Sequence, residues 1–137
     1  MLEVGQIVKA EHKTGQYIGK VASADERRAL VEIMAVLRHP QQGDLHSAYD
    51  PDAALFHERR ASAEREKVWV MLRDAVPYAG EVPAYRESLA AAWETEIRRI
   101  DRMRRWSEQC LQCLDTLREG LWPAFRIVSQ DRARKRD

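Results

Sequence analysis

The chain has 137 residues, and 23 Lys and Arg against 22 Asp and Glu leave a formal net charge of +1. A chain of this length is most simply one domain, which buries roughly two thirds of the surface of its unfolded form and needs no disulfide to fold. The near-zero charge argues against a surface built as a whole for nucleic acid or for an anionic membrane. We expect neither as a partner.

The start of the chain indicates no export. The segment MLEVGQIVKAEHK lacks the apolar core and cleavage site of a secretory signal, and it contains no cysteine that would carry a lipid. The longest apolar runs, such as Ile33 to Leu37, are far shorter than the roughly 20 residues that cross a bilayer. The sequence therefore predicts a cytoplasmic protein with no membrane span.

Residues 1–79 are predicted to form an N-terminal β domain. Apolar runs of strand length alternate with polar turns, with runs at 5–10, 17–21 and 29–37 and turns at 13–15 and 25–28. This pattern favours an antiparallel meander. The apolar residues of the third run occupy both faces and only Glu32 interrupts them, so we expect a central strand that is covered on both sides.

A long loop is expected at 38–54, followed by a fourth strand over about 57–70. This stretch is ambiguous, because its alanines and glutamates favour a helix while Val68, Trp69 and Val70 favour a strand. We interpret it as a strand. A turn at 72–74 then leads into Val76-Pro77-Tyr78, where the β domain is predicted to end.

The hydrophobic period changes after Pro83, and residues 80–130 are predicted to be helical, packed on the β domain or extending from it. Apolar residues spaced by three or four form two successive stripes: Tyr85, Leu89, Trp93, Ile97 and Ile100, then Cys110 or Leu111, Leu114, Leu117 and Leu121. Ser107 is a candidate N-cap, so two helices and one helix broken near 105 fit equally well. Pro123 interrupts the pattern, and 131–137 are predicted to be a basic tail.

Two segments hold the candidate site, Arg38-His39-Pro40-Gln41-Gln42-Gly43-Asp44-Leu45-His46 and Phe56-His57-Glu58-Arg59-Arg60. Imidazole and carboxylate groups bind zinc, nickel or iron, so the histidines with Asp44 offer a metal site as one interpretation. His57 beside Glu58 and the arginines offers a general base with an anion-binding pair as another. Neither has a recognised ligand spacing or a complete catalytic set, so structural roles are the simpler interpretation of both.

The cysteines and aromatic residues have similarly simple interpretations. Cys110 and Cys113 lie on one helix face without a second cysteine pair, so we expect small core residues and not a redox or zinc site. The four tryptophans and Tyr17, Tyr49 and Tyr78 are predicted to pack in or around the core, because base stacking needs interleaved basic residues.

Several segments, taken in chain order, resemble the bacterial kinase-associated protein B family of spore-forming Firmicutes: Lys13 to Gly19, Ala35 to His46, Leu55 to Ala61, Val76 to Tyr78 and Pro83 to Tyr85. The resemblance covers residue 4 to about 100 and implies a mainly β plus α protein, a small SH3-like β-barrel followed by C-terminal helices. It implies an accessory protein that supports a sensor histidine kinase in the sporulation phosphorelay by binding, without catalysis or a cofactor.

Some members of the family are described as lipoproteins. This sequence lacks the N-terminal lipobox cysteine, so membrane contact is expected only through the kinase. Two further departures are Ser47-Ala48, where the family tends to carry a proline, and the region beyond about 104, which looks like a lineage-specific extension.

Three hypotheses follow for the motif residues, which are His39, Pro40, Gln42, Gly43, Asp44, Leu45, His46, Phe56, His57, Glu58, Arg59 and Arg60. In the first, they form a polar surface that binds a kinase or another regulator, with Arg59 and Arg60 pairing bidentately and Phe56 or Leu45 as an apolar anchor. In the second, His39, His46 and His57 converge in a small metal- or ligand-dependent enzyme. In the third, Pro40, Gly43 and Asp44 shape the loop and serve folding.

Overall fold

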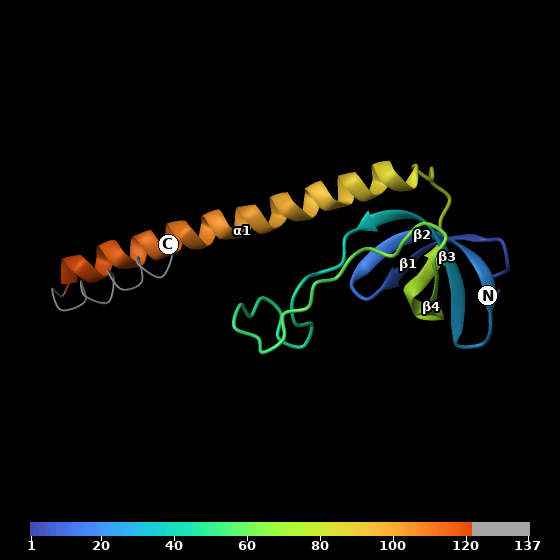
Figure 1. Ribbon diagram of the computed structural model, residues 1–137, viewed down its shortest axis with the longest axis horizontal. Coiled ribbons are helices and arrows are strands. Elements are labelled where there is room, and N and C mark those ends of the chain that lie inside the picture. Colours follow the sequence, from blue (N-terminus) through green and yellow to red (C-terminus); the bar gives the residue numbers. More distant parts are fainter. Residues whose placement is uncertain (122–137) are drawn as a thin grey trace. The chain divides into compact units, whose positions relative to one another are not determined.

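The computed structural model describes residues 1–121, so the predictions for Pro123 and for the basic tail lie outside the described residues. The chain divides into two compact units, residues 1–96 and 97–137, and we describe each by itself. The described elements are β1 (Ile7–His12), β2 (Gly15–Ala24), β3 (Arg28–Arg38), β4 (Lys67–Met71), the 3-10 turn η1 (Leu72–Asp74), β5 (Ala75–Pro77) and α1 (Tyr85–Leu121), all shown in Figure 1. Mixed β and α structure is thus confirmed, while the boundary at 79 stays a prediction.

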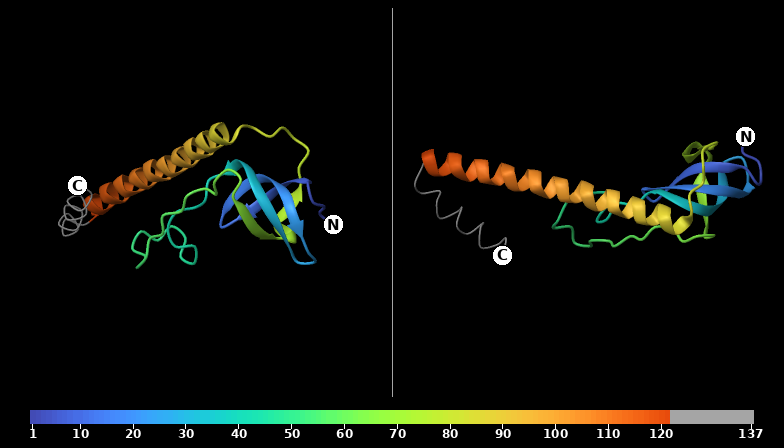
Figure 2. Two further views of the ribbon diagram at one scale, coloured as in Figure 1. Left: turned by 45° about the vertical axis from the view of Figure 1, so that its right-hand side comes forward. Right: turned by 90° about the horizontal axis from the view of Figure 1, so that it is seen from above.

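The five strands form one antiparallel sheet in the order β4-β3-β2-β1-β5. Successive strands from β1 to β4 are neighbours, which confirms the predicted meander, and β5 returns to pair with β1 (Figure 2). In that pairing Ala10 lies opposite Ala75 and Val8 opposite Pro77. Closure of this sheet into an SH3-like barrel stays a prediction.

Both predicted turns between the first three strands are present. Lys13 and Thr14 join β1 to β2 with φ values of 47° and 69°. A two-residue turn with both φ angles positive has the twist that matches two antiparallel strands. At the second turn, the Asp25 carboxylate accepts hydrogen bonds from the backbone N–H groups of Arg27 and Arg28 (2.8 and 2.9 Å), which hold its pKa below the ordinary value.

Gly19 is required where β2 approaches β3. A Cβ atom at this position would lie 2.3 Å from Val31 Cγ1 and 2.7 Å from the Glu32 carbonyl oxygen. The pairing shifts register beside it, between Ile18 and Gly19. Such bulges bend a strand and increase its twist, so the close approach accompanies a local bend of the sheet.

A core cluster of buried residues takes side chains from all five strands. Its largest fully buried members are Tyr17, Ile33, Val8, Val21 and Val31, while Ile18, also fully buried, lies outside this cluster. On β3 the buried residues alternate as predicted through Ala35, but Leu37 is exposed and Leu30 and Met34 are only half-buried. The interior position of this strand is confirmed, because β3 pairs with β2 and with β4, but the prediction that both of its faces are covered is wrong, because Leu30 and Met34 are only half-buried.

The predicted strand over 57–70 is wrong before Lys67. Arg65 has a φ of 69°, and this left-handed conformation interrupts an extended backbone. Residues 57–64 follow an irregular path without strand pairing. Hydrogen bonds from Arg65 N–H to Ile33 O and from Ile33 N–H to Glu66 O then lead into the pairing of β3 with β4.

The helix α1 runs unbroken for 37 residues, so both the two-helix prediction and a break near 105 are wrong. Asp101 pairs with Arg104 and with Arg105, three and four residues later, directly across the predicted break. Pairs at this spacing stabilise a helix. Ser107 lies within the helix and is not an N-cap. Among the described residues, no helix combines the length and the apolarity that crossing a membrane requires.

Several predicted core residues are exposed. Cys113 is exposed and Cys110 is half-buried, so the assignment of both cysteines to the core is wrong. Trp93 and Trp106 are 53% and 69% exposed on α1. Trp69 is exposed on β4, where the Arg28 guanidinium lies 4.0 Å from the ring centroid. Tyr17, by contrast, lies in the core as predicted.

Candidate functional site

The segment between β3 and β4 leaves the sheet and returns as two legs that lie side by side (Figure 1). Gln42 on the outgoing leg donates through Nε2 to the Arg59 carbonyl oxygen and accepts through Oε1 from the Arg59 N–H, both at 2.7 Å. The Arg59 guanidinium donates in return to the carbonyl oxygens of Gln41 (3.0 Å) and Gly43. We call this arrangement of Gln42 and Arg59 the loop clasp.

Gly43 and Asp44 shape the loop beyond the clasp, as the folding hypothesis expects. Gly43 has a φ of 91°, and a Cβ atom there would lie 3.0 Å from the Phe56 ring. Its N–H donates to the His57 carbonyl oxygen (2.9 Å). The Asp44 carboxylate accepts from the His46 N–H (2.9 Å), which closes a local turn. These motif residues therefore contact the chain's own backbone.

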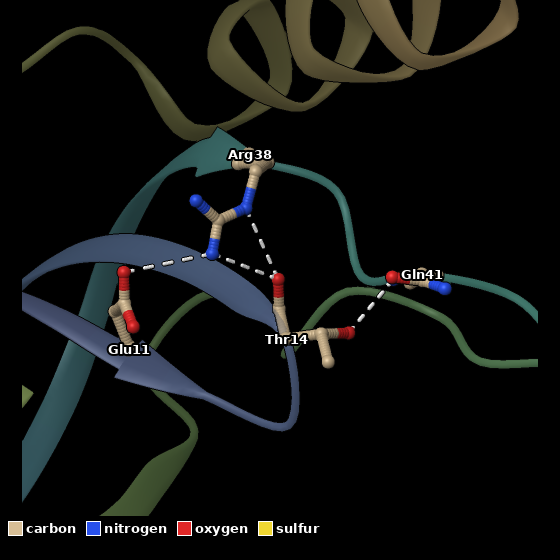
Figure 3. Close-up of polar contacts among 4 residues, drawn as sticks. All are labelled: Glu11, Thr14, Arg38 and Gln41. Carbon is tan, nitrogen blue, oxygen red and sulfur yellow. Dashed lines mark hydrogen bonds and ion pairs between the residues drawn. The ribbon is translucent and has the colours of Figure 1, made fainter. Parts of the chain in front are cut away.

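The base of the loop is fixed to the β1–β2 turn, as Figure 3 shows. Arg38 donates through Nε and Nη2 to the Thr14 carbonyl oxygen (3.2 and 3.1 Å), and its Nη2 lies 3.6 Å from Glu11 Oε1. The Gln41 N–H donates to Thr14 Oγ1 (2.8 Å). Residues from two segments, 11–14 and 38–41, thus hold the loop base in one position.

The histidines do not form a ligand set. His39 directs Nδ1 at the carbonyl oxygen of Pro40 (2.9 Å), while His46 and His57 are exposed. In the part of the chain that the structure describes, no three His, Cys, Asp or Glu side chains lie where they would hold a metal ion. Among the described residues, the three histidines of the metal interpretation therefore do not come together as metal ligands.

A groove lies where the returning leg meets the start of α1. Its volume is about 560 Å³, and its lining residues are His39, Arg60, Ala61, Ala63, Tyr85, Arg86, Leu89, Ala90 and Trp93. Apolar side chains form most of this lining, and His39, Arg60 and Arg86 add imidazole and guanidinium groups. We call it the Trp93 groove. Of the lining residues, only His39 and Arg60 belong to the motif. The helical lining residues were not identifiable as a site from the sequence, because their only recognisable feature was the apolar spacing of a helix.

Hydrogen bonds hold the first turns of α1 beside this groove. Tyr85 donates its hydroxyl to the Ser62 carbonyl oxygen (2.6 Å), and burial raises its pKa. The buried Ser88 accepts from the Val36 N–H (2.9 Å) and donates to the Tyr85 carbonyl oxygen (2.7 Å). Both walls of the groove are therefore held by hydrogen bonds to backbone atoms.

A second, polar pocket of about 540 Å³ lies on the other side of the returning leg, lined by His12, Lys13, Tyr17, Pro40, Arg59, Arg60, Ala61, Ser62, Ala63 and Glu66. Burial lowers the pKa of His12, the charge of Lys13 lowers it further, and Glu66 acts in the opposite direction. Arg60 is the motif residue that lines both of these cavities.

Comparison with known proteins agrees with the geometry of the fold. The family model described as "Kinase associated protein B" matches residues 12–121. The chain is 40% identical over 116 residues to kinase-associated lipoprotein B of Bacillus subtilis (strain 168), covering 84% of this chain and 91% of that relative. A crystal structure of kinase-associated protein B from Bacillus cereus is similar with a TM-score of 0.62 and 35% identity, over 74% of this chain and 79% of that chain.

The family match also revises one prediction. It continues to residue 121, so the assignment of residues 104–121 to a lineage-specific extension is wrong. The matched region includes both legs of the loop, the clasp and the Trp93 groove. The chain belongs to the kinase-associated protein B family.

Proposed function

We propose that this protein is a non-enzymatic accessory protein that binds a sensor histidine kinase in the phosphorelay that initiates sporulation, and that the kinase docks in the Trp93 groove. Membership of a family whose printed names are kinase-associated supports the class of partner. The observation that carries the choice of surface is an apolar groove with a half-exposed tryptophan and three basic or imidazole side chains.

The residue types of the groove suit protein binding. Tryptophan and arginine dominate the energetics of protein interfaces, because they bury a large area and pair with polar groups at the same time. Trp93 is 53% exposed and has apolar surface left to bury. Arg60 and Arg86 favour a partner segment that carries carboxylates beside its apolar residues. In this proposal His39 and Arg60 contact the partner, while Gln42, Gly43 and Arg59 keep the loop in shape.

We further propose a class for the sheet. We infer that the sheet belongs to the SH3-like barrels. This is supported by the meander order, the return of β5 to β1 and the 3-10 turn between β4 and β5.

We also propose that the protein is located in the cytoplasm. The relative from Bacillus subtilis is named a lipoprotein, so fractionation of cells is the relevant measurement, and recovery in the membrane fraction without the kinase would contradict this placement.

Binding of the kinase is the direct test. Trp93→Ala and Arg60→Ala are each expected to weaken binding of the cognate sensor kinase by at least about 10-fold, which corresponds to a loss of about 1.4 kcal/mol or more of binding free energy. Isothermal titration calorimetry with the purified kinase measures this, and circular dichroism checks that the variants are folded.

Matched variants outside the groove serve as controls. Trp106→Ala removes another exposed tryptophan of α1, and Arg73→Ala removes an exposed arginine of η1. Both are expected to bind the kinase like the unmodified chain. Equal affinity of all four variants would mean that the kinase docks elsewhere, and absence of binding by the unmodified chain would contradict the proposed partner.

A further inference from the structure

An apolar seam runs along the second unit. Within residues 97–121, successive members of the seam are three or four residues apart, except Met103 and Cys110, which are seven apart. The members are Ile100, Met103, Cys110, Leu114, Leu117 and Leu121. Ser107 occupies the remaining position. Leu114, Leu117 and Leu121 are 54%, 60% and 80% exposed. We call this set the leucine seam.

The spacing of the seam is that of a coiled coil. Alternating steps of three and four give a mean period of about 3.5 residues, which keeps one stripe of each helix turned toward a partner helix. The period holds from Ile100 to Leu121, which is three full heptads. A helix that only covers a globular core needs no such strict repeat.

The charges of this helix are divided between its two halves. Residues 97–105 contain five arginines and one aspartate, a net charge of +4. Residues 106–121 contain three acidic residues and one arginine, a net charge of −2. Two parallel copies would place the two positive halves together, whereas two antiparallel copies place each positive half against a negative one.

We propose that two copies of this chain associate through the leucine seam as an antiparallel coiled coil. Heptad positions allow antiparallel registers that differ by seven residues, and in the proposed register Ile100 lies opposite Leu117 of the second copy and Met103 opposite its Leu114. Ser107 then lies opposite Cys110 of the second copy, on each side of the two-fold axis. All the apolar members of the seam up to Leu117 acquire a partner in this arrangement.

Sedimentation equilibrium of the full chain tests the association. The unmodified chain is expected to be a dimer, and Leu114→Glu is expected to raise the dissociation constant by about 100-fold or more, because a buried leucine is lost from each copy. Thr116→Glu adds the same charge on the exposed polar side of the helix and is expected to leave the dimer intact.

If the unmodified chain is a monomer, the proposal is overturned. This holds even if a variant without residues 122–137 forms a dimer, because residues 122–137 and not a second copy would then cover the seam in the full chain. Equal effects of Leu114→Glu and Thr116→Glu would show that the seam is not the interface.

Oxidative crosslinking tests the orientation. In a Cys113→Ser background, Ser107→Cys is expected to form a disulfide-linked dimer with Cys110 of the second copy, and the background alone is expected not to crosslink. A parallel pair in register brings Cys110 of the two copies together, so crosslinking of the background alone overturns the antiparallel arrangement. Salt gives a second measurement: screening weakens an antiparallel pair and strengthens a parallel one, so strengthening by salt contradicts the proposal.

Discussion

Gln42 and Arg59 act first on the backbone of their own chain. Each of them hydrogen-bonds to main-chain atoms of the opposite leg, so the clasp holds together two segments that have no strand pairing. At these two positions, the residues of the family motif therefore stabilise the loop. The exposed motif residue Arg60 is left free to line both neighbouring cavities.

Replacing Gln42 tests the clasp. Gln42→Ala removes the acceptor of the Arg59 N–H and the donor to its carbonyl oxygen, so the free energy of unfolding is expected to fall by about 1 to 3 kcal/mol. Urea unfolding followed by tryptophan fluorescence measures this. Gln41→Ala is the control, since Gln41 contacts Thr14 and Arg59 through its backbone, and a change within about 0.5 kcal/mol is expected. A larger loss for Gln41→Ala than for Gln42→Ala would contradict the clasp.

The sequence drew attention to this loop but not to its internal contacts. Pro40, Gly43 and Asp44 are residue types that shape loops, and the structure places Gly43 and Asp44 in such roles. The pairing of Gln42 with Arg59 spans 17 residues and needs the two legs to meet. Because neither residue carries a local signal for that meeting, the clasp was not predictable from the sequence.

At the scale of elements, α1 is joined to the sheet through one buried hydroxyl. Ser88 Oγ accepts the N–H of Val36, which would otherwise be a buried donor without a partner. An unsatisfied buried donor costs more than the net value of the hydrogen bond, because its desolvation is no longer compensated. Ser88 therefore supplies the hydrogen bond that joins the start of the helix to Val36 near the end of β3.

Ser88→Ala is expected to lower the free energy of unfolding by about 1 to 3 kcal/mol, and Thr116→Ala, at an exposed site of the same helix outside the leucine seam, by less than about 0.5 kcal/mol. Both changes replace a hydroxyl residue by alanine, a better helix former, so helix propensity largely cancels in the comparison. Chemical denaturation of the two variants measures the difference. Equal stabilities would show that the hydroxyl is not needed at this contact.

Elements were predicted where a local period or a turn signal existed. The first three strands, the turns between them, the turn at 72–74 and the helical stripe all follow from such signals. The strand expected over 57–66 fails because its residues have no continuous neighbour in the sheet, which propensity does not report. The break expected near 105 fails because Asp101 pairs with Arg104 and Arg105 and no proline or glycine stops the helix there.

For the whole molecule, the stability is expected to depend on pH through His12. Its pKa in the folded protein is lowered from the ordinary value of 6.5 by burial and by Lys13, against a smaller opposite effect of Glu66. Between the two pKa values the unfolded chain binds more protons than the folded one, so stability is full above 6.5 and is lost as the pH falls through the folded value.

The measurement is the free energy of unfolding between about pH 7.5 and pH 5. His12→Gln is expected to reduce the loss of stability over this range, because the variant has no proton to take up at this site. His46→Gln, at an exposed position of the loop, is the control and is expected to leave the pH dependence unchanged. A pH dependence identical in all three proteins would contradict the role of His12.

The sequence by itself determined the meander, the helical region and the family. Alternation of apolar residues, turn residues and motif segments are local patterns, so they can be recognised without knowing the tertiary structure. Only the tertiary structure decided which motif residues hold the loop and which line the groove beside α1. It alone showed the Trp93 groove, whose walls lie more than 20 residues apart in the chain at His39 and Arg60, and again at Arg60 and Tyr85. Such a surface depends on contacts between distant segments, and no local pattern encodes those contacts.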